Sequence, residues 1–410
     1  MPASPSTARA INDRLALRLL QQEGPLTAGQ LKQFTGLSRP TVADLVERLT
    51  AAGLIAVVGE SGEQRRGPNA RLYGIVADRA HLAALDVRTE GVSVLVSDLL
   101  GRVLAEASVP IGGDTGTGPA VEQAVAVVER AAKEAGADRL HTVGIGAPGL
   151  IDPATGELRD SSGLPEWHRR LVAALQERLP ARVTVENETN LAALAEQREG
   201  AARDRDTFVL LWLGHGTGAA VVLDGALRRG ASGGTGEIGF LPVPGTGTLP
   251  SATDCEGGFH SLAGSAAITE LAGEYGLFAQ GAGHEPLSAG LVREAVAAVA
   301  GGGGPRGAVV PAPPGADRAA RFLDALADRL AIGAASVTAI LDPGCVVLGG
   351  EVGQAGGEVL AVRVEERLAR MSPLRTEVRA STLGGAAVLR GALLTARDGA
   401  QDELFVPPSR

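Results

Sequence analysis

The stretch from Val183 to Asn190 constrains the fold more than any other part of the sequence. It opens with Val183-Thr184-Val185, a β-branched run that favours a strand. Polar residues follow directly, and an Ala/Leu-rich helical pattern then begins at Leu191. In α/β sheets, polar side chains at the carboxyl end of a strand usually face the ligand crevice. The stretch therefore predicts an α/β fold with a cleft at this position.

Length and composition limit the class of protein. A chain of 410 residues is too long for one ordinary domain and predicts two or three. Apolar residues make up 45%, enough for sizeable cores, but no apolar run reaches membrane-spanning length. The polar N-terminus lacks the apolar segment of a signal peptide, and two cysteines are too few for a disulfide framework. We expect a cytoplasmic protein that does not associate with a membrane.

Residues 1–77 have the pattern of three short helices followed by a β-hairpin. Helical spacing of apolar residues predicts a first helix over residues 11–22, and Thr27 and Ser38 are suitable N-caps for a second and a third. Strand patterns over residues 54–58 and 71–76 flank a charged loop. This order of elements is typical of a winged helix-turn-helix.

In this class of domain the third helix enters the major groove with its N-terminal residues forward, and the hairpin loop contacts phosphates or the minor groove. The region has nine Arg/Lys and six Asp/Glu, a net charge of +3, whereas residues 78–410 have 29 and 41, a net charge of −12. The alternative is a winged helix that contacts protein, with a solvated hairpin loop and Ser38 as a cap only. The predicted DNA-contacting residues are Ser38, Arg39, Pro40, Thr41, Asp44, Arg65, Arg66 and Asn69.

Residues 78–410 alternate between strand and helix patterns, and several strands end in glycine-rich turns. This alternation predicts an α/β body with two sheets and a cleft. The motifs, in chain order, are Asp86 with its turn, Gly146-Ala147-Pro148-Gly149, Glu186-Asn187-x-x-Asn190, Gly214-x-Gly216-Thr217-Gly218, Gly236-Glu237-Ile238-Gly239, Asp342-Pro343 through Gly349-Gly350, and Leu383-Gly384 through Gly391-Ala392.

Together, their order and spacing resemble the ROK family of repressors, open reading frames and sugar kinases. The resemblance implies a two-lobed, actin-like ATPase fold, and the winged helix in front looks like that of the family's sugar-responsive regulators. The implied division is a DNA-binding domain over 1–77, a first lobe over 78–190 completed by about 384–403, and a second lobe over 191–383.

The sequence departs from the family's kinases at the first phosphate-binding turn. Kinases carry Asp-x-Gly-Gly-Thr there, whose glycines let backbone N–H groups approach ATP phosphates. Here the turn reads Asp86-Val87-Arg88-Thr89-Glu90, without glycine and with an added negative charge. We therefore expect no productive ATP binding. The second loop, with Gly214, Gly216, Thr217 and Gly218, is interpreted as a structural turn retained with the fold, although it is also suitable for phosphate.

The resemblance also implies a general base, which in kinases is the Asp of Glu-Asn-Asp. Here that position is Glu188, whose extra methylene shifts the carboxylate by about 1 Å, and such a misplacement can cost on the order of 100-fold in rate. We expect lost catalysis with retained sugar binding, and so no catalytic residue. The implied ligand-binding residues are Gly149, Asn187, Glu188, Glu237 and His260, the last with the alternative of being simply an exposed loop residue.

Family members with structural zinc have a His after Gly-Glu-Ile-Gly and then a run of cysteines. In this sequence Phe240 stands at the His position, and the later stretch retains Cys255 alone, with His260 nearby. One Cys and one His do not supply a tetrahedral zinc site. We predict no zinc at this position. Because the first turn also lacks the glycines that ATP needs, we predict that the protein has no cofactor.

These features predict a DNA-binding regulator of carbohydrate-related genes, a repressor, whose cleft binds a sugar or related metabolite. A homodimer or homotetramer would place two heads on a pseudo-palindromic operator. One alternative is an active sugar kinase with an autoregulatory head, and another is constitutive DNA binding with a pocket that binds nothing. The sequence does not identify the operator, the target genes, the effector or the sign of regulation.

Overall fold

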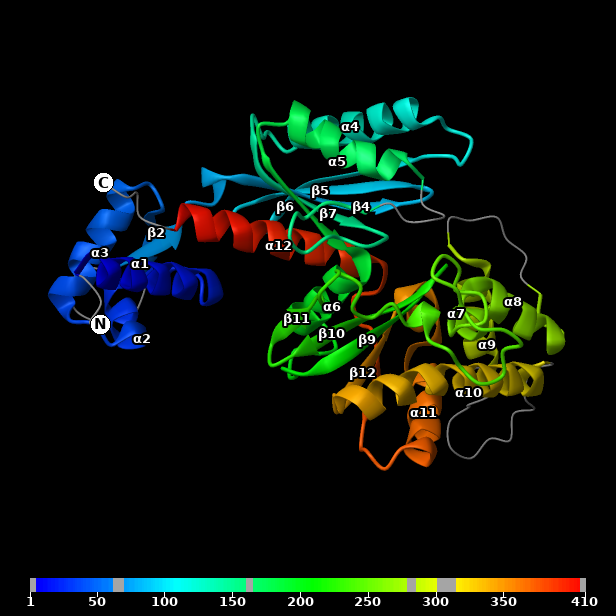
Figure 1. The fold of residues 1–410 in the computed structure, drawn as a ribbon. Helices are drawn as coiled ribbons and strands as arrows, with labels where there is room; N and C mark the ends of the chain where they lie inside the picture. Colours follow the sequence, from blue (N-terminus) through cyan, green and yellow to red (C-terminus); the bar gives the residue numbers. More distant parts are fainter. Residues whose placement is uncertain (1–4, 62–69, 160–164, 279–284, 301–314, 406–410) are drawn as a thin grey trace.

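The structure is a computed structural model that describes residues 5–61, 70–159, 165–278, 285–300 and 315–405. A small head and a two-lobed body are visible in Figure 1, joined beside the end of the last helix. Among the described residues, no helix is long and apolar enough to cross a membrane.

The head is a winged helix-turn-helix, as predicted. Its elements are α1 (Pro5–Gln22), β1 (Leu26–Thr27), α2 (Ala28–Thr35), α3 (Arg39–Ala51), β2 (Ile55–Ser61) and β3 (Ala70–Ile75), and the strands form an antiparallel sheet in the order β1-β3-β2. Thr27 caps α2 in a capping box with Gln30, and Gly36 ends it at φ 70°. The first helix begins six residues earlier than predicted, because a sequence without a clear N-cap leaves its start undefined.

The first lobe is built on a sheet in the order β6-β5-β4-β7-β8. In Figure 1, α4 and α5 cover one face of this sheet and α12 lies on the other. The elements are β4 (His81–Arg88), β5 (Gly91–Asp98), β6 (Val103–Pro110), α4 (Thr117–Glu134), β7 (Leu140–Ala147), α5 (Trp167–Arg178), β8 (Arg182–Asn187) and α12 (Ala387–Leu404). The parallel pairs β4–β7 and β7–β8 bring the carboxyl ends of three strands to one edge of the sheet.

The second lobe has its own five-stranded sheet, in the order β11-β10-β9-β12-β13. Its strands are β9 (Phe208–Leu213), β10 (Thr217–Leu223), β11 (Ala226–Arg228), β12 (Cys345–Gly349) and β13 (Glu377–Ala380). Its helices are α7 (His260–Ala263), α8 (Ser265–Glu274), α9 (Leu287–Ala300), α10 (Ala316–Leu341) and α11 (Gly350–Met371). Apolar residues of both sheet and helices form one continuous core in this lobe.

Helix α6 (Glu188–Glu199) connects the lobes and packs against α12 and β10. The two helices approach at Gly391, where an added Cβ atom would lie 2.0 Å from the carbonyl oxygen of Leu191. The chain thus returns at its end to the first sheet, over the segment placed in the first lobe from the sequence. The division proposed between residues 190 and 191 falls inside α6.

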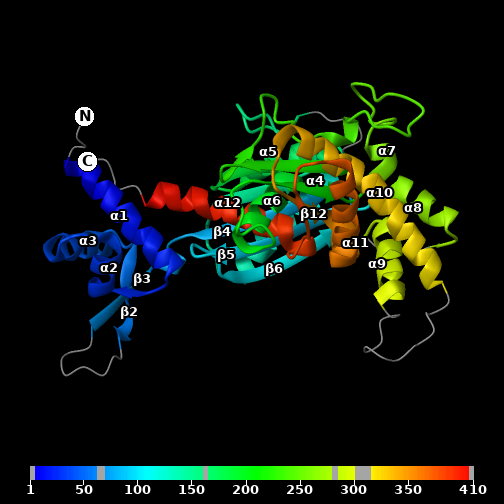
Figure 2. The same cartoon turned by 90° about the horizontal axis from the view of Figure 1, so that it is seen from below.

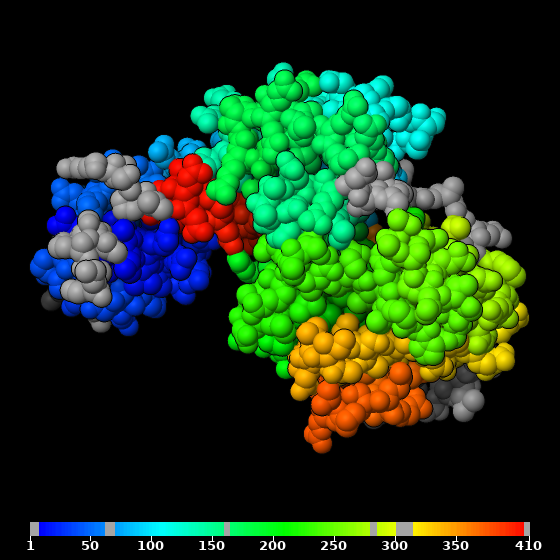
Figure 3. All heavy atoms as spheres, in the orientation of Figure 1, coloured from blue at the N-terminus to red at the C-terminus, as the bar shows by residue number. Residues whose placement is uncertain are grey.

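The head meets the body beside the C-terminal end of α12. A short 3-10 turn (Ala77–Arg79) connects β3 to β4, and the Leu99 N–H donates to the Ala77 carbonyl. Phe405, which follows α12, is buried in an apolar cluster that contains residues of both head and body. Figures 2 and 3 show the head set apart from the two lobes, with α12 extending to it from the body.

Candidate functional site

One end of the cleft is organised around Asn187, where β8 ends and α6 begins. Its side-chain Oδ1 accepts from the N–H groups of Thr189 and Asn190, at 2.9 and 3.3 Å, and so caps α6. Its Nδ2 donates to the Gly149 carbonyl at 3.0 Å, which fixes the loop after β7. Asn187 and Gly149, both predicted ligand residues, are therefore brought together by the cap.

Glu186 lies beneath this cap and is buried. Its Oε1 accepts from the Asn187 N–H at 3.0 Å and from Asn190 Nδ2 at 2.9 Å. Its Oε2 accepts from Arg229 Nε at 2.6 Å, and Arg229 follows β11 in the second lobe. Glu186 belongs to a motif seen in the sequence, but nothing local indicates a partner 43 residues away, so this ion pair between the lobes was not predicted.

Glu188, the predicted vestigial base, is the first residue of α6 and only partly accessible to solvent. Burial and then the neighbouring Asp86 carboxylate raise the pKa of Glu188 to about 8, against the partial opposition of Arg88. Near neutral pH its carboxyl group is therefore mostly protonated and neutral. In that form Glu188 can donate one hydrogen bond to a ligand but does not accept a proton.

Arg88 lies on the other side of Glu188 from the Asn187 cap, and its charge and that of Glu188 act on each other. Its Nε donates to Asp86 Oδ2 at 2.9 Å, and its Nη1 forms an ion pair with Glu351 at the start of α11. Burial raises the pKa of Asp86, and its Oδ1 has no hydrogen-bond partner among the described residues. Arg88 thus joins the first lobe to the second at the turn where the sequence lacks its glycines.

Glu351 lies directly against the predicted vestigial phosphate loop. A Cβ atom added at Gly214 would be 2.6 Å from Glu351 Oε2 and 3.0 Å from Trp212 Nε1. The Gly214 N–H donates within the loop, to the Gly216 carbonyl at 3.0 Å. The Arg88 and Glu351 side chains therefore occupy the space between the two turns. Sequence reasoning missed Glu351, although its position just after Gly349-Gly350 offered a signal.

Thr217 and Gly218, the other predicted residues of this loop, begin β10. Thr217 Oγ1 is buried without a hydrogen-bond partner among the described residues, and lies 3.3 Å from the position of a Cβ atom added at Gly239. A Cβ atom added at Gly218 would be 3.5 Å from Thr189 Oγ1 on α6. These contacts pack the loop onto the lobe-connecting helix, and its interpretation as a structural turn stays a prediction.

Glu237 and His260, the remaining predicted ligand residues, belong to the second lobe. Glu237 is exposed. A Cβ atom added at Gly234 would lie 3.6 Å from Glu237 Cγ and 3.4 Å from Leu150 Cδ2 of the first lobe. His260 begins α7 and is half-buried, and burial lowers its pKa. The contacts thus bring Glu237 near the Gly149 loop, whereas His260 has no described contact with Asn187 or Glu188.

The loop over residues 245–262 corresponds, by the resemblance, to a zinc-binding loop of other family members. In this structure hydrogen bonds and apolar packing hold it. Thr246 Oγ1 donates to the carbonyls of Val243 and Gly257, at 3.0 and 2.8 Å. Phe259 is fully buried against the backbone of Gly333 on α10. The described residues contain no group of three or more His, Cys, Asp or Glu side chains that could hold a metal ion. The absence of zinc remains a prediction.

The predicted DNA face lies at the N-terminus of α3. Ser38 Oγ accepts from the Thr41 N–H at 3.3 Å and lies 2.7 Å from Thr41 Oγ1, so Ser38 is the N-cap. Arg39 and Pro40 are exposed in the first turn. Asp44 forms an ion pair with Arg48, whose Nη2 also contacts the buried Asp13 at 2.5 Å. Arg65, Arg66 and Asn69 lie outside the described residues.

Comparison with known proteins defines the class to which this fold and cleft belong. Residues 82–398 match the ROK family, and the chain therefore belongs to that family. Residues 11–67 match the MarR family, in agreement with the winged helix-turn-helix of the head.

Among individual relatives, the N-acetylglucosamine repressor of Escherichia coli is 28% identical over 243 residues, covering 57% of this chain and 58% of its own length. The xylose repressor of Bacillus subtilis is 23% identical over 59% of this chain and 62% of its own. The glucokinase of Thermotoga maritima is 32% identical over 55% of this chain and 68% of its own. The chain thus spans less than two thirds of the length of the repressors it matches.

Solved structures agree on the architecture. A ROK family transcriptional regulator, a homologue of the Escherichia coli MLC protein, superposes with a TM-score of 0.73 over 97% of this chain and 98% of its own, at 21% identity. The ROK hexokinase from Thermus thermophilus has a TM-score of 0.59 over 78% of this chain and 99% of its own, at 29% identity. The regulator matches head and body together, and so supports the predicted fold of the whole chain.

Proposed function

We propose that this chain is a transcriptional regulator, a repressor of carbohydrate-related genes. Its head binds operator DNA, and its body binds a sugar or related metabolite without phosphorylating it. The exposed, capped first turn of α3 supports DNA binding, since Arg39 there is free to contact a base edge. The similarity to repressors that carry sugar names supports the ligand class.

The observation that carries this proposal over a kinase is the ion pair of Arg88 with Glu351. A nucleotide triphosphate needs backbone N–H groups and open space between the two turns. Instead, the Glu351 carboxylate lies beside Gly214, and the Arg88 cation is already neutralised by Asp86 and Glu351. A bound triphosphate would therefore meet a carboxylate in the same space and would have to displace both side chains. We infer that ATP is not a ligand and that no cofactor is needed.

The proposed effector site extends from the Asn187 cap to Glu188, which also neighbours Asp86 and Arg88. Gly149 and Asn187 supply backbone and amide groups, Glu188 supplies a neutral carboxyl group, and Glu237 contributes from the second lobe. A ligand that contacts both lobes favours the lobe angle at which those contacts form. Helix α12 packs on α6 beside the cleft, and Phe405, which follows it, lies in the core shared with the head. A change in lobe angle can therefore reach the head.

The DNA-binding part is tested by selecting sequences from a random duplex library on the full chain and titrating the enriched duplex by fluorescence anisotropy. Arg39→Ala should weaken binding to the enriched duplex about 10-fold or more, because a bidentate base contact is worth about 1–3 kcal/mol. The control is Arg178→Ala, which removes a surface arginine of α5 that pairs with Glu122 on α4. Equal affinity for enriched and scrambled duplexes at matched salt would count against the proposal.

The effector part is tested by adding sugars to the DNA complex. N-acetylglucosamine, xylose, glucose and their phosphates should be compared, and at least one should change the DNA affinity of the wild type but not of Asn187→Ala. Gel filtration with light scattering on the same samples distinguishes the proposed homodimer from a homotetramer. If no sugar shifts either the DNA affinity or the melting temperature, the pocket is inert and DNA binding is constitutive.

A sugar kinase is the second candidate, because a general base works best with a pKa near the operating pH and the pKa of Glu188 is about 8. Coupled detection of ADP release over the same sugars separates the two functions. Turnover that disappears in Glu188→Gln and persists in Arg178→Ala would establish the kinase. We expect no turnover above the protein-free control for either the wild type or the variant.

A further inference from the structure

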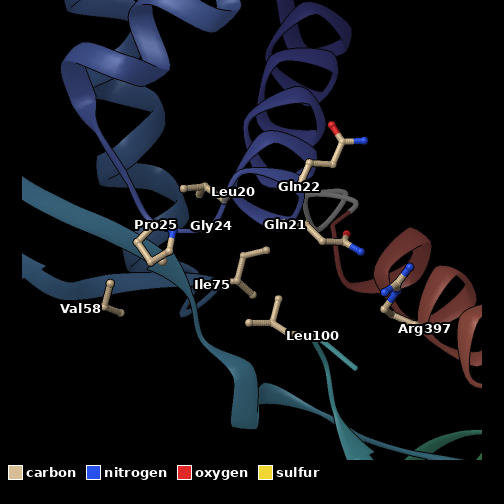
Figure 4. A pocket seen from close by; sticks show the side chains of 10 residues that line it. Leu20, Gln21, Gln22, Gly24, Pro25, Val58, Ile75, Leu100 and Arg397 are labelled. Carbon is tan, nitrogen blue, oxygen red and sulfur yellow. The ribbon is translucent and has the colours of Figure 1, made fainter. Parts of the chain in front are cut away.

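A second concave site lies between the head and the body, well away from the cleft. It is a cavity of about 450 Å³, which is in the size range of pockets for small organic ligands. The end of α1, the hairpin strands β2 and β3, the turn after β5, and α12 all contribute to its wall (Figure 4). A ligand held here would therefore touch both the DNA-binding domain and the body.

Arg397 of α12 is the one charged side chain among the described residues that line this cavity. Its side chain is only 17% exposed, and its Nε is buried without a hydrogen-bond partner in the described part of the chain. Within the described part of the chain, the closest carboxylate oxygen is Asp398 Oδ1, 3.8 Å from Nη2. A buried guanidinium normally has a closer and better oriented acceptor than this.

The acidic residues near Arg397 are already engaged by other arginines. Asp398 Oδ2 is 2.7 Å from Arg198 Nη2, and Glu199 Oε2 is 2.7 Å from Arg390 Nη2. Two carboxylates thus face three guanidinium groups, and Arg397 is the one without a close partner. Burial accordingly lowers the pKa of Arg397, since its charge is poorly compensated. The site has an excess of one positive charge and room for a counterion.

The rest of the wall is largely apolar, with Leu20, Pro25, Val58, Ile75 and Leu100 among the lining residues. Val58 and Leu100 are 54% and 37% exposed, which leaves apolar surface uncovered inside the cavity. In Figure 4, Ile75 and Leu100 lie between Val58 of the hairpin and Arg397 of α12. An apolar wall with one guanidinium at its edge suits a ligand that has an apolar body and a single anionic end.

We propose that this cavity binds a small organic carboxylate, whose carboxylate accepts two hydrogen bonds from Arg397 and whose apolar part covers Leu100, Ile75 and Val58. The proposal goes beyond the proposed function and does not depend on it, since it concerns binding alone. One guanidinium neutralises one carboxylate, whereas a phosphate dianion would keep an uncompensated charge in a mostly apolar site.

The test is isothermal titration calorimetry of the full chain with benzoate and hexanoate, their neutral isosteres benzamide and hexanamide, and inorganic phosphate. The carboxylates should bind saturably, at least about 10-fold more tightly than the amides, because a hydrogen-bonded charge pair contributes that much. Arg397→Gln should remove this preference, and Arg178→Gln should not change it.

A second pair of variants keeps the test decisive if Arg397→Gln unfolds. Leu100 lies next to Gly101, where an added Cβ atom would be 3.6 Å from Arg397 Nη1. Leu100→Glu should therefore place a carboxylate beside Arg397 and abolish benzoate binding, whereas Leu100→Gln should retain most of it. Equal affinity for benzoate and benzamide, tighter binding of phosphate than of benzoate, or no difference between Leu100→Glu and Leu100→Gln would each overturn the proposal.

Discussion

At one end of the cleft Arg229 donates to Glu186, and at the other Arg88 joins Asp86 to Glu351. Both ion pairs connect the two lobes, but the groups around them differ. Arg229 is 47% exposed and approaches a carboxylate that already supports the Asn187 cap, so the backbone groups around Gly149 keep their places. Arg88 and Glu351 instead occupy the space between two turns that would hold a phosphate chain.

The two ends therefore differ in what holds them. At the Asn187 end, the cap fixes amide and backbone polar groups beside the Gly149 loop. At the Arg88 end, two side chains of opposite charge pair with each other. Under the proposed function, a metabolite bound at the Asn187 end would act on the head through the angle between the lobes.

Removing the carboxylate beneath the Asn187 cap should have the largest effect on stability. Glu186→Ala leaves the Asn187 N–H, Asn190 Nδ2 and Arg229 without their shared acceptor, and should lower the free energy of unfolding by about 3–5 kcal/mol. Glu186→Gln, which can keep one acceptor oxygen, should lose less. Urea unfolding followed by circular dichroism measures both, and equal losses would show that only the ion pair matters.

Breaking the other bridge should cost somewhat less. Arg88→Ala leaves the buried Asp86 without a cation and should reduce the free energy of unfolding by about 2–4 kcal/mol. Glu351→Gln is the matched control, because Arg88 then keeps Asp86. If Arg88→Ala instead stabilises the chain, the bridge is no more than a tolerated replacement. The same variant, combined with Thr89→Gly, also tests whether an opened turn binds ATP.

The charge state of Glu188 predicts a dependence on pH. With a folded pKa of about 8 against 4.5 when unfolded, the native state keeps a proton that the unfolded chain has lost. The contribution of Glu188 to stability is therefore complete below about pH 4.5 and declines as the pH rises towards 8. Relative to the wild type, Glu188→Gln should gain up to about 4 kcal/mol between about pH 5 and pH 9, since one pKa unit corresponds to about 1.36 kcal/mol. Glu122→Gln, on the exposed surface of α4, should follow the wild type throughout.

The smallest effect should come from Arg229, the exposed partner of Glu186. Arg229→Ala removes a half-exposed guanidinium while Glu186 keeps both hydrogen bonds to the cap, so the expected loss is about 1 kcal/mol or less. Thermal unfolding of Arg229→Ala beside Arg88→Ala compares the two bridges directly. A loss as large as that of Arg88→Ala would remove the distinction between the two ends of the cleft.

Local signals in the sequence determined the kinds of elements in this chain and most of their order. Thr27 and Ser38 are N-caps as predicted, because capping depends on residues only three positions apart. Glycine-rich turns after strands identified the ROK body for the same local reason. The sequence also shows that the first phosphate turn has no glycine, and on that ground it predicts no ATP binding, which stays a prediction.

Only the tertiary structure decided what fills that turn. Arg88 meets Glu351 across 263 residues, Glu186 meets Arg229 across 43, and Arg397 faces the head from the far end of the chain. Ion pairs of this kind carry no periodicity and no fixed spacing, because each partner is placed by the packing of a different sheet or helix. The sequence shows which chemical groups are present at each position. Which charges pair with each other follows from how the two lobes and the head fold together.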